Sequence, residues 1–311
     1  MQTINSKYNL VRFYLGPALM FVLSGSLSVM LAFYSAHFLK KLSLVDMTGG
    51  TLIFFAGLTL FMFAIFIPVK YLKNAPRIHL DKETIRFGNR EAFQLGNIRE
   101  IRLTGKVPFS FLVNTPVEGS RIRFTDGTEK FIYDDFYYNA WQLKQFLFER
   151  TADKFSQTDN LSADNKSDEG FKFFKRFPLL SISGVLQYGV LLFSGFILAG
   201  TSISFSEGMI FMSVATLVFL IYGLHMYYPG VSGKYLLIKN QTYFFFRKKY
   251  ALSDIREVTF EQPGRSTVNL RIITSDFKSR LYPCATLSHH SWYALEEELE
   301  KRNIPVRNEC V

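Results

Sequence analysis

Polar side chains inside long apolar stretches are the first residues in this sequence that could do chemistry. Gln187 and His225 lie in two such stretches, and His225 is followed by Tyr227 and Tyr228. A polar group in lipid is costly and often belongs to an ion or substrate path. Both residues are therefore candidate intramembrane polar groups of a transporter or channel component. The alternative for His225 is an interfacial position, because tyrosines gather at headgroup depth.

A basic and aromatic segment is the second candidate site. Arg247, Lys248 and Lys249 directly follow three phenylalanines, in a predicted turn between two strands. Each cation close to an anionic leaflet contributes about 1 kcal/mol of binding, and adjacent rings can enter the headgroup layer. The three residues are therefore lipid-contact candidates, with a solvated turn as the alternative. The matching turn of the first half, residues 90–92, is nearly neutral.

The sequence contains few residues in the spacings that metal binding or catalysis needs. Cys284, His289 and His290 could supply three zinc ligands, but a structural site needs a fourth, and neither Cys-x-x-Cys nor His-x-x-x-His spacing is present. No nucleophile elbow, phosphate-binding glycine loop or paired carboxylates are evident either. The sequence predicts a protein that is not an enzyme, with no catalytic residue, no metal and no cofactor. A membrane-bound enzyme is the third of the functions considered below.

Composition narrows the class of protein that must position these residues. The chain has 311 residues, 36 Lys and Arg against 26 Asp and Glu, a formal net charge of +10, and 48% hydrophobic residues. Its charged residues amount to 20%, below the share of about 25% in soluble domains. The basic residues are scattered, so no nucleic-acid partner is expected. Two cysteines are too few for a disulfide framework and are consistent with reduced thiols facing a cytoplasm.

Four apolar stretches are long enough to cross a bilayer, which takes about 20 residues of helix. They form two closely spaced pairs, at residues 13–39 and 47–69, and at residues 177–206 and 208–233. Basic residues flank the second pair at both ends, which favours a cytoplasmic position for those ends. Lys40 and Lys41 in the loop of the first pair weaken the same argument there. We therefore predict a multi-pass protein with both termini in the cytoplasm.

An internal repeat is visible when the chain is compared with itself. Residues 78–103 align without a gap to residues 235–260 at an offset of 157, with eight identities in 26 positions. Between the repeats, a polar segment at about residues 151–171 has too few apolar side chains to offset the entropy of ordering. It is predicted to be a flexible linker.

Each repeat is predicted to end in a strand-rich module closed by a helix. Short alternating runs bounded by turn residues indicate antiparallel strands, and Asp126-Gly127 is typical of a hairpin turn. Residues 136–150 have helical periodicity, and Ser288 could cap the corresponding helix of the second repeat. About seven strands and one helix are the pattern of a pleckstrin-homology-like (PH-like) barrel.

The phrases Ile-His-Leu-Asp-Lys-Glu-Thr-Ile-Arg-Phe and Leu-Gly-Asn-Ile-Arg-Glu-Ile-Arg-Leu, placed after a membrane hairpin, resemble bacterial membrane proteins that carry a PH-like domain after such a hairpin. The resemblance implies two transmembrane hairpins, with four spans in total, each followed by a PH-like β-barrel closed by a C-terminal helix. It also implies a bacterial cytoplasmic (inner) membrane. The expected segments are hairpin 1 at 1–73, PH-like domain 1 at 74–150, a linker at 151–171, hairpin 2 at 172–233 and PH-like domain 2 at 234–311.

The function expected from these features is binding. The two cytoplasmic modules would serve as binding or scaffolding surfaces for a protein partner or for the anionic leaflet, so that membrane lipid and an unidentified protein are the expected partners. A transporter or channel component, with a site between the two hairpins, is the alternative.

Overall fold

Two compact units make up the chain in the computed structural model, unit 1 (Met1–Gln157) and unit 2 (Thr158–Val311). The structure describes residues 3–10, 73–89, 91–110, 114–151, 170–200, 205–262 and 267–310, with scattered residues between 55 and 70. The two units are described one at a time.

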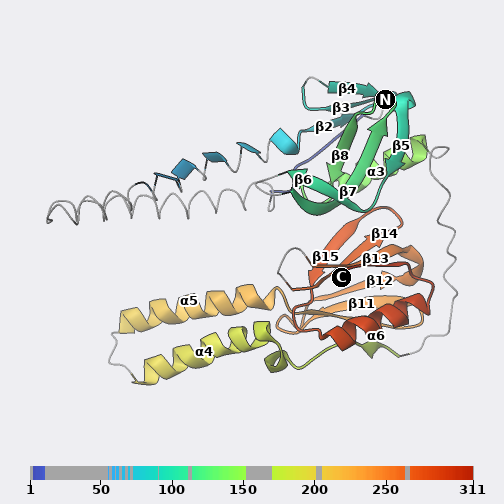
Figure 1. Cartoon of the computed structure of the whole chain (residues 1–311). Coiled ribbons are helices and arrows are strands. Elements are labelled where there is room, and N and C mark those ends of the chain that lie inside the picture. Colours follow the sequence, from blue (N-terminus) through green and yellow to red (C-terminus); the bar gives the residue numbers. More distant parts are fainter. Residues whose placement is uncertain are drawn as a thin grey trace. The chain divides into compact units, whose positions relative to one another are not determined.

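Unit 1 contains two antiparallel sheets and a helix (Figure 1). The first sheet has the order β1-β2-β3-β4, and in the second β7 pairs with β5, β6 and β8. Alternate residues of these strands point into the core, as the two-residue period of a strand dictates; Ile78 and Leu80 are examples. The elements are β1 (Ile4–Asn5), β2 (Ile78–Leu80), β3 (Thr84–Phe87), β4 (Glu91–Gln94), the 3-10 helix η2 (Leu95–Asn97), β5 (Ile98–Arg102), β6 (Lys106–Ser110), β7 (Asn114–Phe124), β8 (Glu129–Tyr133) and α3 (Ala140–Arg150).

Unit 2 repeats this plan, and its described residues also include two long helices and a C-terminal strand. Its sheets have the orders β12-β11-β10-β9 and β15-β14-β13-β16, and β16 runs parallel to β13. Both sheets and α6 contribute side chains to one buried apolar core. The elements are β9 (Lys172–Phe173), η4 (Pro178–Leu180), α4 (Ile182–Gly200), α5 (Phe205–Gly223), β10 (Tyr227–Val231), β11 (Tyr235–Asn240), β12 (Arg247–Ala251), η5 (Leu252–Asp254), β13 (Ile255–Glu261), β14 (Asn269–Thr274), β15 (Ser279–Pro283), α6 (His289–Glu300) and β16 (Val306–Glu309).

The strand registers of the two units differ from the gapless alignment of the repeats. From η2 and η5 onward the offset is 157, and both units have a register shift two residues later, at Ile98/Glu100 and Ile255/Glu257. Strands β4 and β12, just before these turns, also have the offset 157, since Gln94 corresponds to Ala251. In the earlier strands the offset is 151, because the pair Leu80–Ile85 corresponds to the pair Val231–Leu236. Unit 2 therefore has six additional residues between β11 and β12, and this insertion contains the phenylalanines of the candidate site.

The expected fold class is wrong for the residues that the structure describes. Among them are four α-helices and four sheets, and α4 is the one helix long and apolar enough to cross a membrane. The stretch expected to span at residues 208–233 leaves the helix at Gly223 and enters strand β10, whose Val231 is buried in the core of unit 2. Its apolar character at that end reflects a buried strand.

The first two expected spans cannot be compared in the same way. Residues 13–39 lie outside the described residues, and of residues 47–69 only scattered positions are described, among them Phe55 and Met62, which are exposed. The linker expected at 151–171 also lies almost wholly outside the described residues. The five-segment division of the chain therefore stays a prediction.

The expected closed PH-like barrels are also wrong. In each unit the described strands form two separate sheets, because the 3-10 turns η2 and η5 interrupt the chain between them. No ladder joins the two sheets of a unit within the described ranges. The structure therefore does not support classifying the protein as a transmembrane PH-like protein.

Candidate functional site

The six-residue insertion forms a loop, residues 241–246, that we call the aromatic loop. Asn240 starts it: its side-chain Oδ1 accepts hydrogen bonds from the backbone N–H groups of Thr242 and Tyr243, both at 2.8 Å. An asparagine that bonds the backbone two residues ahead turns a chain out of extended structure. This is why residues 242–246 are a turn, although their aromatic and β-branched side chains predict a strand.

The aromatic loop is attached to the base of the helical hairpin formed by α4 and α5. Gln187 on α4 donates its amide N–H groups to the carbonyl oxygen of Phe219 on α5, at 3.1 Å, and to Oγ1 of Thr242, at 3.0 Å. The hydroxyl of Tyr243 donates to the carbonyl oxygen of Leu220, also on α5, at 2.6 Å. The loop therefore holds a fixed position relative to both helices.

The end of α5 completes this attachment. The side-chain amide of Asn240 donates to the carbonyl oxygen of Gly223 at 2.8 Å. A Cβ atom at position 223 would lie 2.8 Å from Cγ2 of Thr242, so the close approach of the loop requires a glycine there. Gln187, predicted as a polar group of a transport path, thus has a structural role in joining three segments of unit 2.

The aromatic residues of the loop divide into two kinds. Tyr243 is bonded to α5, and Phe246 packs against Tyr227 at a ring-centroid distance of 5.1 Å. Phe244 and Phe245 instead are 88% and 72% exposed, and their rings contact each other at 5.7 Å. Two anchoring rings therefore hold a turn that presents two phenylalanines outward.

The hairpin next to this loop also has an exposed apolar surface. In Figure 1, α4 and α5 lie side by side and project away from the strands of unit 2. Large apolar side chains are exposed on both helices, among them Ile182, Phe196 and Leu217. Exposed apolar side chains on neighbouring helices are typical of a surface that another molecule or a membrane covers.

The three basic candidates lie at the start of β12, and their predicted position in a turn is wrong. All three side chains are exposed. Successive strand residues point to opposite faces, so Arg247 and Lys249 share one face and Lys248 lies on the other. The ammonium of Lys249 lies 3.4 Å from the ring centroid of Tyr235, and that of Lys248 lies 6.0 Å from the centroid of Tyr250. The adjacent residues therefore do not form a single charged cluster.

His225 lies between α5 and β10, where it is exposed. Its Nδ1 lies 3.3 Å from the carbonyl oxygen of Ile221, and its own carbonyl accepts a hydrogen bond from Ala285 N. Among the described residues no contact joins His225 to Gln187. The structure therefore does not bring the two predicted intramembrane polar residues together.

The residues considered for zinc binding are separated by their environments. Cys284 is buried, its Sγ donates to the carbonyl oxygen of Tyr282, and burial raises the pKa of its thiol well above the ordinary value. His289 and His290 are exposed in the first turn of α6. Within the described ranges there is no group of three His, Cys, Asp or Glu side chains that could hold a metal ion.

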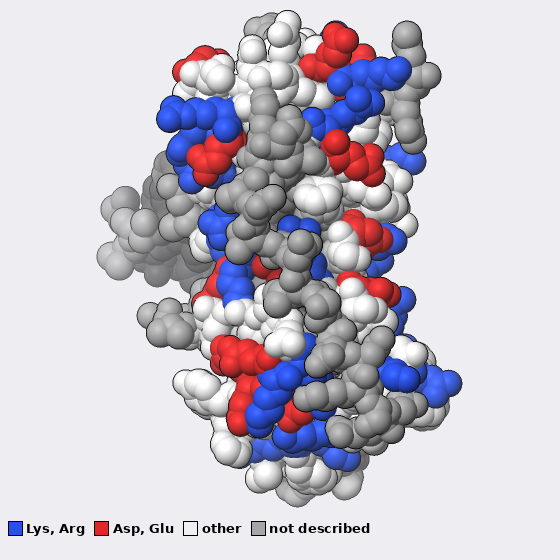
Figure 2. Space-filling model, turned by 90° about the vertical axis from the view of Figure 1, so that its right-hand side faces the viewer, with Lys and Arg blue, Asp and Glu red and all other residues white. Residues whose placement is uncertain are grey.

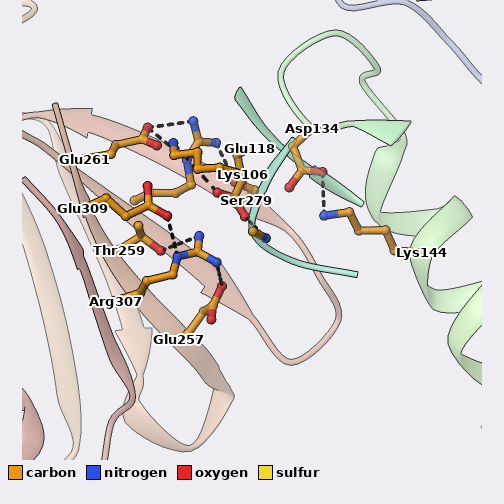
Figure 3. A network of polar contacts seen from close by, with 12 residues as sticks. Lys106, Glu118, Asp134, Lys144, Glu257, Thr259, Glu261, Ser279, Arg307 and Glu309 are labelled. Atoms are coloured by element: carbon orange, nitrogen blue, oxygen red, sulfur yellow. Dashed lines mark hydrogen bonds and ion pairs between the residues drawn. The ribbon is translucent and has the colours of Figure 1, made fainter. Parts of the chain in front are cut away.

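Ion pairs occupy most of the side-chain carboxylates that the structure describes in unit 2. In Figure 3, Arg307 lies between Glu257 and Glu309, with N–O distances of 3.3 and 2.9 Å. Arg271 is bonded to Glu261 at 2.8 Å. Acidic and basic side chains are likewise interspersed over the surface seen in Figure 2. The cations that remain without a carboxylate partner among the described residues include Lys175, Arg176, Lys239, Arg247, Lys248 and Lys249.

Sequence reasoning did not find Asn240, Thr242 and Tyr243 as parts of this site. A usable signal was present, since the run Asn-Gln-Thr after an apolar strand is typical of a turn.

Compared with known proteins, the chain matches no protein-family model and no curated protein. The resemblance to hairpin-bearing bacterial membrane proteins therefore stays a prediction.

Proposed function

We propose that this protein is a non-enzymatic, membrane-associated binding protein whose unit 2 rests on an anionic leaflet through the aromatic loop and the start of β12. In this proposal the α4–α5 hairpin buries its apolar side chains in the bilayer. The observation that carries the proposal is the position of Phe244 and Phe245: two exposed rings on a loop that is hydrogen-bonded to the base of an exposed apolar hairpin.

The energies of these groups favour lipid over water. Burying a phenylalanine side chain contributes about 1.5–3 kcal/mol, and each cation at an anionic surface adds about 1 kcal/mol. Arg247 and Lys249 are exposed on one face of β12, directly after the loop. The burial of the phenylalanine rings and the attraction of the cations to the leaflet therefore act at the same end of unit 2.

The attachment of the aromatic loop to the hairpin fixes the position of the two exposed rings relative to α4 and α5. Because Gln187 and Tyr243 attach the loop to α4 and α5, the depth of the hairpin in a bilayer sets the depth of Phe244 and Phe245. A loop that moved freely would lose conformational entropy on entering the headgroup layer. The attached loop has already lost most of this conformational entropy on folding.

Accessibility of a nitroxide label at position 245 tests this proposal. The full chain with Phe245→Cys and Cys310→Ser is labelled and reconstituted into vesicles of phosphatidylglycerol and phosphatidylcholine. Cys284 is buried, with a raised thiol pKa, and does not compete for the label. We expect frequent collisions of the label with oxygen, which partitions into lipid, and few with a water-soluble nickel reagent.

A matched label at Ser253→Cys serves as the control. Ser253 is exposed in η5, at the far end of β12 from the aromatic loop. We expect that label to be open to the nickel reagent. Two changes should weaken the attraction to the leaflet: the double substitution Arg247→Glu, Lys249→Glu, which reverses two charges, and high salt, which screens them. Either change should make the label at position 245 more accessible to the nickel reagent. Equal nickel accessibility at positions 245 and 253 would contradict the proposal and favour a protein partner instead.

A further inference from the structure

A pocket of about 580 Å³ lies at the base of the hairpin in unit 2, beside the aromatic loop. Its wall comes from three segments: the residues that lead into α4, strand β10, and the end of β11 with the start of the loop. Lys175, Arg176 and Lys239 line it together with Tyr228 and Gln241. None of these residues was singled out as a binding residue by its sequence pattern.

The charge of the pocket is positive and unbalanced. Lys175, Arg176 and Lys239 have no carboxylate partner among the residues that the structure describes. Lys239 is held in place by the ring of Phe173, at 4.7 Å from its centroid. Three cations around one pocket favour an anionic group such as a phosphate, since charge-assisted hydrogen bonds to phosphate oxygens are among the stronger polar contacts.

The polar wall of the pocket points to a second feature of the ligand. Gln241 donates its side-chain amide to the carbonyl oxygen of Arg176 at 3.0 Å, which joins two parts of the wall. Its Oε1 is buried and has no hydrogen-bond donor among the described residues. A buried acceptor without a donor is unfavourable. A ligand that carries a hydroxyl group beside its anionic group would satisfy it.

The surface around the pocket is apolar. Phe177 and Phe244 lie at its edge and are exposed. Exposed Leu180 and Ile182 continue this surface from η4 onto α4. A cationic pocket that opens onto an apolar helix surface matches a molecule with an anionic headgroup and hydrocarbon chains.

We propose that this pocket binds the headgroup of one anionic phospholipid, with a phosphodiester at the three cations and a headgroup hydroxyl at Gln241, while the acyl chains lie along α4. This inference rests on the proposed function and adds to it a defined site and a lipid class. Phosphatidylglycerol has both features, a single negative charge and two headgroup hydroxyls.

Native mass spectrometry of the full chain in detergent tests the pocket. We expect the protein to bind phosphatidylglycerol at least tenfold more tightly than phosphatidylcholine, and more tightly than phosphatidylpropanol, which is anionic but lacks the hydroxyls. Lys175→Glu with Arg176→Glu should reduce phosphatidylglycerol binding about tenfold or more. Lys234→Glu, an exposed residue at the opposite end of β11, is the matched control and should leave binding unchanged.

Two further arms identify the source of the phosphate and separate this inference from the proposed function. Inorganic phosphate or glycerol phosphate that displaced the lipid at equal concentration would show a site for free phosphate and overturn the lipid assignment. Unchanged phosphatidylglycerol binding in the Lys175→Glu, Arg176→Glu variant would overturn the pocket, while a lipid-protected label at position 245 would still support the leaflet contact.

Discussion

Gln187 shows that the bonding partners of a single polar residue cannot be found from its surroundings in the sequence. A buried amide in an apolar stretch predicts a transport path, but here its N–H groups bond a helix carbonyl and the Thr242 hydroxyl. The reason is geometric: the chain returns to the hairpin through a loop 55 residues later in the sequence. Nothing local to residue 187 indicates that return.

Replacing this amide should release the aromatic loop. We expect Gln187→Ala to remove two hydrogen bonds and to lower the free energy of unfolding of unit 2 by about 1–2 kcal/mol. A nitroxide at position 245 should become more mobile in the same variant. Thermal denaturation and the label's spectrum measure the two effects.

Ser194→Ala is the matched control for that substitution. Ser194 lies on the same helix and is also buried, but its hydroxyl bonds only the carbonyl of Val190, one turn earlier in α4. Its variant should leave the label's mobility unchanged. A loop equally rigid in Gln187→Ala would mean that Tyr243 and Asn240 hold it without Gln187.

At the scale of elements, local turn and cap signals gave accurate predictions. Asp126-Gly127 is the turn between β7 and β8, with Gly127 at a φ of 84°, and Ser288 caps α6 by accepting a hydrogen bond from Ser291 N. These features depend on side chains that bond their immediate neighbours. Strand β10 was missed for the opposite reason, because Tyr227–Val231 continues an apolar stretch and only its pairing with β11 makes it a strand.

Helix α6 depends on a carboxylate whose charge varies with pH. Burial raises the pKa of the Glu298 carboxyl, but hydrogen bonds from Lys172 on β9 and from Arg302 outweigh this effect, so the net pKa lies below 4.5. A lowered folded-state pKa contributes stability above the unfolded-state value, and that stability is lost as the pH falls through the folded-state pKa. These bonds therefore stabilise the fold at neutral pH and fail in acid.

The pH dependence of thermal denaturation should show this contribution. At neutral pH we expect Glu298→Gln to lower the unfolding temperature of unit 2 by about 2–4 °C, for a loss of about 1 kcal/mol. The difference from the unchanged protein should shrink as the pH falls below about 4. A difference that stayed constant down to pH 2 would show that the charge of Glu298 is not its cause.

At the scale of the whole molecule, the insertion is a structural difference between the two units. Both units have the same arrangement of strands around their 3-10 turns. The registers of the described strands show that the connection between β11 and β12 in unit 2 is longer than the matching connection between β3 and β4 in unit 1. The proposed leaflet contact therefore belongs to unit 2. A repeat visible in sequence does not imply that both copies bind the same partner.

The topology expected from the basic residues can be tested on the whole chain. Reporter fusions placed after Arg150 and after Val311 should register on the same, cytoplasmic side of the membrane, since basic segments near apolar helices are retained there. A fusion within the loop between α4 and α5 gives the comparison point. Reporters after Arg150 and Val311 that registered on opposite sides would exclude the shared orientation.

Strand β16 has a consequence for how this chain behaves when it is shortened. Residues Val306–Glu309 run parallel to β13 and form the last strand of that sheet. Proteolysis before Val306 would leave the backbone N–H and C=O groups of β13 unpaired along an open edge. Such an edge is a template for a strand from another molecule, so clipped protein would be prone to self-association even though the buried residues of its core were all still present.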